Sequence, residues 1–305
     1  MRAQVAGAPV SFGVFELTPE GADTVTADEM LAALVETGYT GVDLGPAGFL
    51  GEGDALADRL RRFGLSLAGG WVQLPFSDDD AFEAALPDLA SALRSFSAAA
   101  EAVGGRLPLP TLADDGSAAR RAAPGRGAEV DRLDDAGWDR LTRNAERAVA
   151  LVRAAGLEPT FHHHAGTFVE SPAEIDRFLA RVDIDLTLDT GHLALGGGDP
   201  VDAVHRWGER INHLHLKDVD LGRLREVVAA GGGMREVWSS GVFVAFGRGD
   251  LDVAPVMDAM AARDFDGWVV VEQDVLNGPD TAIGAFLSER TADQQTNRDA
   301  LRRWL

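Results

Sequence analysis

Segments with strand character alternate with segments of helical character along the whole chain, and this alternation constrains the fold most. Strands are predicted at 4–12, 40–45, 65–74, 106–112, 158–164, 183–192, 211–218 and 267–274. Helices are predicted at about 27–37, 54–63, 79–102, 134–155 and 252–263, and two more begin at 172 and 200. Strands joined by helical crossovers form a parallel sheet, because such connections are right-handed.

A parallel sheet of eight strands either closes into a barrel or stays open. An open doubly wound sheet usually carries a glycine fingerprint for phosphate after its first strand, and the segment GAPVSFG (7–13) lacks that spacing. One barrel needs about 250 residues, and the chain has 305. We therefore predict a single-domain (β/α)8 TIM barrel over 1–305, with loop insertions near 113–132 and 219–250.

Composition limits the chemistry and the partners. The absence of cysteine excludes disulfides, thiolate nucleophiles and cysteine-based zinc sites. The formal net charge is −21, which disfavours binding to nucleic acid phosphate and to anionic membranes. The N-terminal segment lacks the pattern of a signal peptide. We expect a cytoplasmic protein with neither nucleic acid nor membrane as a partner, and the sequence leaves a homo-oligomer open.

Histidine and lysine are concentrated in three short segments. Six of the seven histidines lie in HHHAG (162–166), DTGH (189–192) and HLHLKD (213–218), and the seventh, His205, falls in a predicted helix. Lys217 is the only lysine of the chain, and every other basic side chain is arginine. A general preference for arginine does not explain why the one exception stands beside two histidines at a strand end.

Strand periodicity places these side chains inside the barrel. Residues two apart in a strand share a face, so His213, His215 and Lys217 point inward while the intervening leucines point outward. By the same rule Asp189 and Glu272 point inward. All lie at the C-terminal ends of their strands, where TIM barrels build their active sites.

Four strands thus deliver metal-type ligands to one end of the barrel. Each motif alone has a simpler explanation: a packed pair for the two histidines of HLH, a helix cap for DTGH, and chance for HHH. Together they indicate a metal site, because a buried aspartate, histidine and glutamate need a compensating cation. Oxygen and nitrogen ligands suit one divalent ion, Mn²⁺ or Co²⁺ first and Mg²⁺ or Zn²⁺ next.

These motifs, in this order, resemble a known family. The segments HHHAGT, LDTGHLALGGGDP, INHLHLKD and GWVVVEQD are similar to those of the xylose isomerase-like TIM barrels of the sugar isomerase and epimerase superfamily. Within it the likeness is greatest to the inosose (2-keto-myo-inositol) dehydratases. The segments APVSFGVFE, GYTGVDLGPAGFL and SGVFVAFGRGDLD extend the resemblance over nearly the whole chain.

The resemblance implies specific metal ligands. By motif position they are Asp189, His215 and Glu272, with His162 at the strand-five position. The epimerases carry a glutamate there, so the histidine argues against a two-carboxylate epimerisation. A triple histidine is the pattern expected of the dehydratase branch.

The implied reaction removes water next to a ketone. Lys217, with its pKa lowered by burial and a nearby cation, is predicted to act as base or enolate partner. His192 is a second acid/base candidate, and His164 is predicted to protonate the departing hydroxide.

The implied substrate is a small polyhydroxylated keto compound, such as a keto-inositol. Its predicted contacts are His163, His213, Trp71 and Asp43, with a sugar-stacking role for Trp71 as an alternative to core packing.

Four other functions remain open at this stage. They are a metal-dependent keto-sugar isomerase or epimerase, a Schiff-base lyase that uses Lys217, a non-catalytic sugar-binding barrel, and a DNA-repair endonuclease. The net charge of −21 disfavours the last of these.

Overall fold

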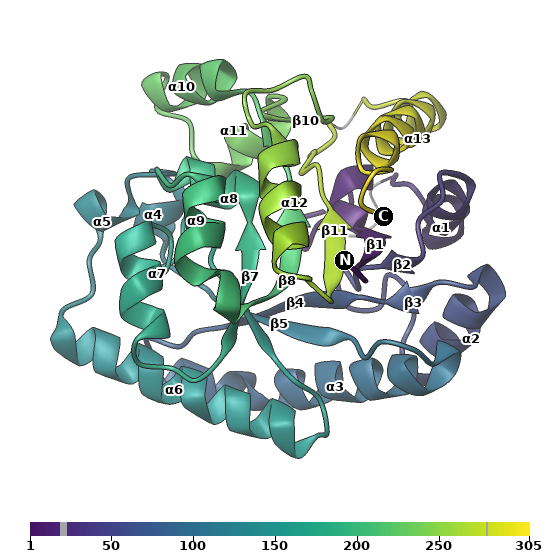
Figure 1. Cartoon of the computed structure of the whole chain (residues 1–305). Coiled ribbons are helices and arrows are strands. Elements are labelled where there is room, and N and C mark those ends of the chain that lie inside the picture. Colours follow the sequence, from purple (N-terminus) through teal and green to yellow (C-terminus); the bar gives the residue numbers. More distant parts are fainter. Residues whose placement is uncertain (19–22, 279) are drawn as a thin grey trace.

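A computed structural model describes residues 1–18, 23–278 and 280–305. It contains one parallel sheet with the strand order β3-β2-β1-β11-β8-β7-β6-β5-β4 (Figure 1). The strands are β1 (Gln4–Gly7), β2 (Gly41–Val42), β3 (Ser66–Leu67), β4 (Gly69–Leu74), β5 (Leu109–Asp114), β6 (Thr160–His162), β7 (Asp185–Asp189), β8 (Ile211–Leu216) and β11 (Trp268–Val271).

The sheet closes through a single residue between β3 and β4. Ala68 donates its backbone N–H to Val42 O of β2 at 2.9 Å, and its carbonyl accepts the N–H of Leu109 of β5 at 3.0 Å. Residues 66–74 therefore bridge the two ends of the sheet, and β3 and β4 together fill the third of eight strand positions. This confirms the predicted TIM barrel, with the predicted strand 65–74 divided in two.

Helices surround the sheet on its outer side (Figure 1). They are α1 (Ala27–Glu36), α2 (Gly53–Phe63), α3 (Asp79–Val103), α6 (Asp135–Ala154), α7 (Pro172–Leu179), α8 (Thr190–Leu195), α9 (Pro200–Trp207), α12 (Val253–Ala262) and α13 (Ile283–Ala300). The core lies between them and the sheet, where outward leucines such as Leu188 and Leu214 are fully buried. Each such side chain contributes about 1.5–3 kcal/mol by leaving water.

Two helix starts follow the capping rules that their sequences predict. The Thr26 side chain accepts the N–H of Glu29, whose carboxylate accepts the N–H of Thr26. At α7 the carboxylate of Glu174 accepts the N–H of Ser171 in the same way. Such boxes satisfy backbone donors that the first turn leaves free. They fix where each helix leaves its loop.

Two predicted strands have clearly different bounds in the structure, and one helix was not predicted. The strand predicted at 4–12 ends at Gly7, and Pro9–Phe12 forms the 3₁₀ helix η1, because Pro9 has no N–H to donate to a strand. The strand predicted at 106–112 lies at Leu109–Asp114. Helix α13 was not predicted, since the face it buries is polar and includes Asp293 and Gln294.

The two segments predicted as loop insertions contain regular structure. The segment 113–132 holds the end of β5 and two short helices, α4 (Ala118–Arg121) and α5 (Gly127–Val130). The segment 219–250 holds α10 (Leu221–Ala229), α11 (Met234–Ser239) and β10 (Phe243–Val244), which pairs with β9 (Asp218–Val219). Figure 1 shows α10 and α11 beyond the C-terminal ends of β7 and β8.

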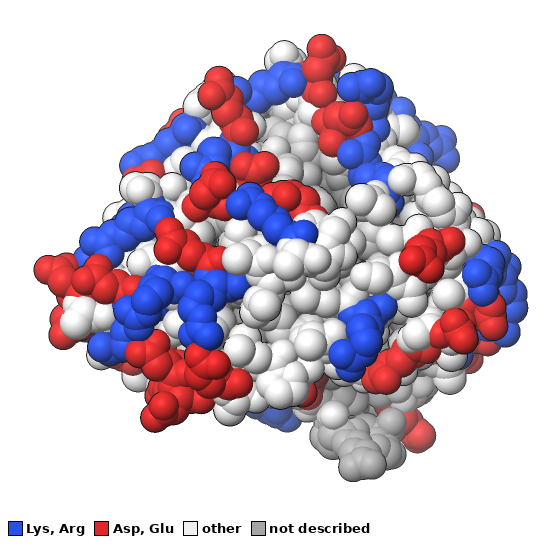
Figure 2. All heavy atoms as spheres, turned by 90° about the horizontal axis from the view of Figure 1, so that it is seen from below, with Lys and Arg blue, Asp and Glu red and all other residues white. Residues whose placement is uncertain are grey.

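The outer surface mixes charges of both signs. On the face in Figure 2, arginine side chains lie among aspartate and glutamate side chains, with uncharged atoms between them. Within the part of the chain that the structure describes, no helix combines the length and apolarity that a membrane crossing requires.

Candidate active site at the C-terminal ends of the strands

A cavity of about 410 Å³ opens at the C-terminal ends of the barrel strands. Seven of the residues predicted from the sequence line it: Asp43, Trp71, His162, His164, His215, Lys217 and Glu272. Trp71, His162 and His215 lie in β4, β6 and β8, and the other four follow the ends of β2, β6, β8 and β11. The barrel thus brings together side chains that are up to 229 positions apart (272 − 43).

The ammonium group of Lys217 lies among three carboxylates. Its Nζ is 3.0 Å from Asp189 Oδ2, 2.9 Å from Glu272 Oε2 and 3.0 Å from Asp274 Oδ1. All four side chains are nearly inaccessible, with 7% or less of the side chain exposed. A buried cation of this kind stabilises the carboxylates, which would repel one another without it.

The three carboxylates raise the pKa of Lys217, whereas the sequence predicted a lowered pKa. Burial alone would lower the pKa, but Asp189, Asp274 and Glu272 together hold the pKa above its usual value. Lys217 is therefore a cation among these carboxylates, which opposes the predicted lowered pKa, while its role as base or enolate partner stays a prediction. Its charge lowers the pKa of Glu272, and His215 lowers it further, against the opposing effect of burial.

Residues of the DTGH motif hold Lys217 in position. Thr190 Oγ1 donates to the carbonyl of Lys217 and accepts its N–H, both at 2.8 Å. Gly191 leaves room for the lysine stem, because a Cβ on Gly191 would lie 2.8 Å from Lys217 Cβ. Asp189 begins helix α8 and accepts the N–H of His192 through Oδ1 at 2.8 Å, which leaves Oδ2 facing the lysine.

His164 reaches the cavity with a defined tautomer. Its Nδ1 lies 2.7 Å from the carbonyl of Ala165, and because a carbonyl can only accept, Nδ1 carries the proton. The ring lies between Trp71, at 5.0 Å between centroids, and His192, at 3.5 Å. Burial lowers the pKa of His164 to about 3, so the ring is neutral and Nε2 holds a free lone pair.

Three other histidines lie behind the cavity wall rather than on it. His163 is fully buried, and its Nε2 accepts the N–H of Asp189 at 3.3 Å. His213 is fully buried one layer below His215, with ring centroids 5.2 Å apart. These positions do not support the predicted substrate contacts of His163 and His213. His192 is also fully buried, 3.4 Å from Asp274, and stacks behind His164.

The donor atoms fit a divalent cation. One ligand atom each of His162, Asp189 and His215 lies within 4.8 Å of the others, and the same holds for His215 with Asp43 and Glu272. Among the described residues, His215 Nε2 and Asp43 Oδ1 are buried without a hydrogen-bond partner. Burial also raises the pKa of Asp43 to about 7. Imidazole and carboxylate donors of this kind suit Mn²⁺, Co²⁺ or Zn²⁺.

Asp274 belongs to the site although the sequence did not single it out. Its carboxylate lies beside Lys217 and His192, and it lines the cavity. Burial raises its pKa to about 7 despite the lysine. It follows the last strand residue, Val271, by three positions, so strand alternation no longer describes its direction. Its position two residues after Glu272 was the available signal.

Comparisons with known proteins place the chain in a family. The family model of the xylose isomerase-like TIM barrels matches residues 31–303. An inosose dehydratase of Geobacillus kaustophilus is 31% identical over 88% of this chain and 86% of its own length. The rhizopine catabolism protein MocC of Rhizobium meliloti is 30% identical over 90% of this chain and 82% of its own length.

A solved structure shows the same fold. The IOLI protein, solved with a bound zinc atom, superposes with a TM-score of 0.69 at 10% identity, over 99% of each chain. The fold, the order of the motifs and the match over nearly the full length agree with one another. The chain therefore belongs to the xylose isomerase-like TIM barrel family.

Proposed function

We propose that this chain is a metal-dependent dehydratase, a hydro-lyase that removes water from a keto-inositol or a similar neutral keto-polyol. The observation that carries the proposal is the placement of a neutral His164 on the cavity wall beside the donor set of His162, Asp189 and His215. The similarity to an inosose dehydratase over 88% of the chain supports the same reaction class.

The metal would be held by Asp189, His215 and Glu272, with His162 as the fourth ligand; these residues come from two groups of candidate ligands that share His215. When bound, a divalent ion supplies Lewis acidity that polarises the ketone and acidifies the neighbouring C–H. Mn²⁺ or Co²⁺ suits this mixture of carboxylate and imidazole donors better than Mg²⁺. The cationic Lys217, which also lines the cavity, stabilises the negative charge that develops on the substrate oxygen.

The proton transfer is assigned to His164. Its Nε2 takes the proton from the carbon next to the ketone, and the C–H electron pair forms the enolate. The same Nε2–H then protonates the β-hydroxyl, the C–O bond breaks, and water leaves as the new C=C bond forms. One residue on one face of the substrate can perform both transfers. His192 supports the ring from behind at 3.5 Å between centroids.

The acidic lining of the cavity suits a polyhydroxylated substrate. Its wall carries six carboxylate side chains and two cationic side chains, which are Glu16, Asp43, Asp114, Asp115, Glu272 and Asp274 against Arg121 and Lys217. Three of these groups, Asp43, Asp114 and Asp274, have pKa values raised to about 7, so the wall offers both hydrogen-bond donors and acceptors. A polyol has hydroxyl groups that can donate hydrogen bonds to carboxylates.

The competing enzymatic functions fit the site less well. An epimerase of this family would need a carboxylate at the position of His162, and the ring there lies 3.1 Å from Asp189 instead. A Schiff-base lyase needs a neutral lysine, and the raised pKa of Lys217 opposes this.

An activity screen with product analysis tests the proposal. The purified protein is treated with a chelator, assayed on inososes and keto-sugars, and assayed again after addition of Mn²⁺, Co²⁺ or Mg²⁺. We expect turnover that is lost with the chelator, restored by Mn²⁺ or Co²⁺, and accompanied by loss of one water. His164→Gln should lower kcat by about 100-fold or more.

The control variant is His205→Gln, which changes an exposed histidine on α9 outside the site. It should retain wild-type turnover. A product with the same mass as the substrate would show that the protein is an isomerase and not a dehydratase. Chelator-resistant turnover with substrate trapped on Lys217 by borohydride would replace it by an imine mechanism.

A further inference from the structure

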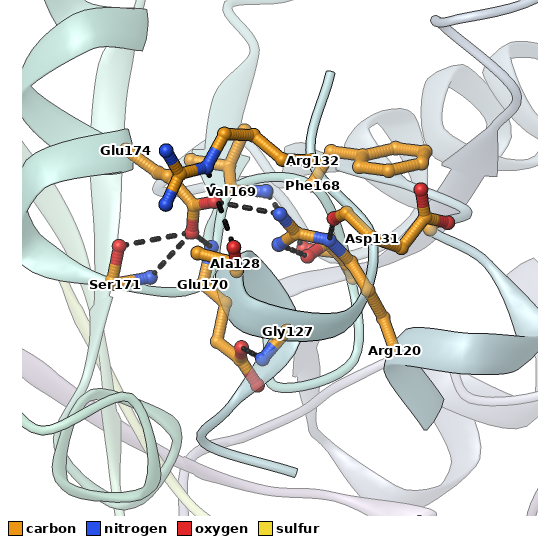
Figure 3. A network of polar contacts seen from close by, with 12 residues as sticks. Arg120, Gly127, Ala128, Asp131, Arg132, Phe168, Val169, Glu170, Ser171 and Glu174 are labelled. Atoms are coloured by element: carbon orange, nitrogen blue, oxygen red, sulfur yellow. Dashed lines mark hydrogen bonds and ion pairs between the residues drawn. The ribbon is translucent and has the colours of Figure 1, made fainter. Parts of the chain in front are cut away.

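Buried hydrogen bonds hold helices α4 and α5 against the loop that carries His164. We call residues 117–131 the α4–α5 segment and residues 163–171 the β6–α7 loop. Figure 3 shows the polar contacts between them, with Arg120 extending from one side and Glu170 from the other. The segment was predicted as a plain loop, and the proposed reaction assigns it no role.

Arg120 is buried and makes three directed contacts. Its guanidinium donates to the carbonyl of Thr167 at 2.6 Å, to the carbonyl of Asp131 at 2.7 Å and to Glu174 Oε1 at 2.7 Å. Its side chain is only 1% exposed, and the guanidinium also lies over the ring of Phe168. The planar arginine fork thus joins both ends of the α4–α5 segment to the β6–α7 loop and to α7.

Glu170 makes the reciprocal connection. Its Oε1 accepts the N–H of Gly125 at 2.9 Å and of Gly166 at 3.0 Å, and its Oε2 accepts the N–H of Gly127 at 2.9 Å. Two of these donors belong to the α4–α5 segment and one to the β6–α7 loop. Burial raises the pKa of the Glu170 carboxyl, and the hydrogen bonds from these three backbone donors oppose that rise.

The two segments touch so closely that side chains are excluded between them. A Cβ on Gly127 would lie 2.6 Å from Glu170 Oε2, and a Cβ on Gly116, which directly precedes the α4–α5 segment, would lie 2.1 Å from the carbonyl oxygen of Gly166. Gly116 has φ +64°, which glycine adopts without strain. Gly116 and Gly127 therefore allow this close contact because they have no side chain.

The hydrogen bonds of Arg120 and Glu170 connect to His164 through the three residues that follow it in the chain. Glu170 holds the N–H of Gly166, and Arg120 holds the carbonyl of Thr167. Thr167 in turn donates its N–H and its hydroxyl to the carbonyl of His164, at 3.2 and 2.8 Å. Ala165, enclosed between these points, presents the carbonyl that accepts His164 Nδ1–H.

We propose that Arg120 and Glu170 are positioning residues for the dehydration: they fix the Ala165 carbonyl and thereby hold His164 with Nδ1 protonated and Nε2 free toward the cavity. Neither residue lines the cavity. Their effect on turnover rests on the proposed role of His164, whereas their effect on the His164 tautomer does not.

The variants Arg120→Lys and Glu170→Gln test this with little change in volume. A lysine ammonium cannot reproduce the planar fork of Arg120. A glutamine keeps one accepting oxygen and turns an N–H donor toward the backbone donors that Glu170 accepts. The matched control is Arg210→Lys, because Arg210 also donates to backbone carbonyls, those of Val182 and Ile184, but at the opposite end of the barrel.

Two readouts are measured on the full-length protein. The first is the ¹⁵N NMR signature of the histidine tautomers after chelator treatment, with the His164 signals identified by their loss in His164→Gln. The second is steady-state kinetics on inosose in the presence of Mn²⁺. For Arg120→Lys and Glu170→Gln we expect a mixture of His164 tautomers and a kcat at least tenfold lower, with KM within threefold. Arg210→Lys should leave both readouts unchanged.

The proposal is overturned if both variants fold and keep the wild-type His164 signature. It is equally overturned if all three variants lower kcat to the same extent, since this would show a general loss of stability. Because the NMR signature needs no substrate, it remains decisive even if the wild-type protein does not turn over inosose. If one variant fails to fold, the other still decides the question.

Discussion

Lys217 Nζ lies 3.0 Å from Asp189 Oδ2, the same oxygen that lies 3.1 Å from the ring nitrogen of His162. Asp189 Oδ2 thus contacts both the only lysine of the chain and another candidate metal ligand, His162. A divalent ion and the lysine both neutralise this oxygen. The affinity for the metal ion therefore depends on the charge of Lys217, and this dependence can be measured.

Replacing Lys217 by methionine should destabilise the protein and strengthen metal binding. The carboxylates of Asp189, Glu272 and Asp274 would lose their shared cation, and breaking a buried ion pair costs about 3–5 kcal/mol. Urea denaturation with chelator should show this loss, and excess Mn²⁺ should reverse part of it, because a ligand of the native state stabilises it. Equal stability of wild type and variant without metal would contradict the charge balance described here.

Removing a proposed ligand should remove the metal. Asp189→Asn and His215→Gln should each weaken Mn²⁺ binding by about 100-fold or more, since changes even to the groups that support ligands cost 10–100-fold. The measurement is calorimetric titration of Mn²⁺ into protein freed of metal. His205→Gln, which changes the one histidine outside the three motifs, should bind like wild type. Wild-type affinity in Asp189→Asn would remove Asp189 from the ligand set.

Gly191→Ala should cost about 1–3 kcal/mol, the usual range for overpacking. The added Cβ would lie 2.8 Å from Lys217 Cβ and displace the lysine from its carboxylates. Thermal denaturation measures the loss of stability, and kcat should fall with it. Gly284→Ala is the control, because a Cβ there meets no atom within 4 Å and the position lies in α13. Similar midpoints for both variants would show that the contact with Lys217 is unimportant.

Asp114 should make wild-type stability depend on pH. Burial raises the pKa of its carboxyl to about 7, from an ordinary value of 3.8. The folded state therefore holds a proton that the unfolded state releases, and stability falls as the pH rises from about 4 to about 7. Asp114→Asn cannot lose that proton. Its Oδ1 can still accept the N–H of Gly116 and of Phe168, which Asp114 now binds through one oxygen.

The stability of Asp114→Asn relative to wild type should thus increase between pH 5 and pH 8. Urea denaturation at pH 5, 6.5 and 8 provides the comparison. Asp88→Asn, at an exposed position of α3, serves as the control for the general effect of removing one negative charge. A difference between Asp114→Asn and wild type that stays constant over this range would rule out the titration of Asp114.

Strand periodicity predicted the barrel and the inward direction of the polar residues, because alternation along a strand depends only on local geometry. It could not predict depth. His213 and His215 share a face, yet His215 lines the cavity and His213 lies in the layer beneath it. Depth depends on the register between strands, such as the pairing of Trp268 with His213, and a single sequence does not contain that register.

The charge state of Lys217 was unpredictable for a related reason. Burial of the lysine could be inferred from its position on β8, and burial alone lowers its pKa. The opposing carboxylates come from β7 and from the residues after β11, including Asp274, for which alternation had no meaning. Helix α13 escaped prediction because its buried face carries polar residues such as Asn297, which bonds the N–H of Phe246.

The solitary lysine has a practical consequence for how the chain responds to amine-directed chemistry. Its ε-amino group is 2% exposed and paired with carboxylates, so acylating reagents react with it only when these ion pairs open. Apart from the seven histidines, every other basic side chain is a guanidinium, which such reagents leave unmodified under mild conditions. The rate at which Lys217 is labelled therefore measures how often its ion pairs with Asp189, Glu272 and Asp274 open.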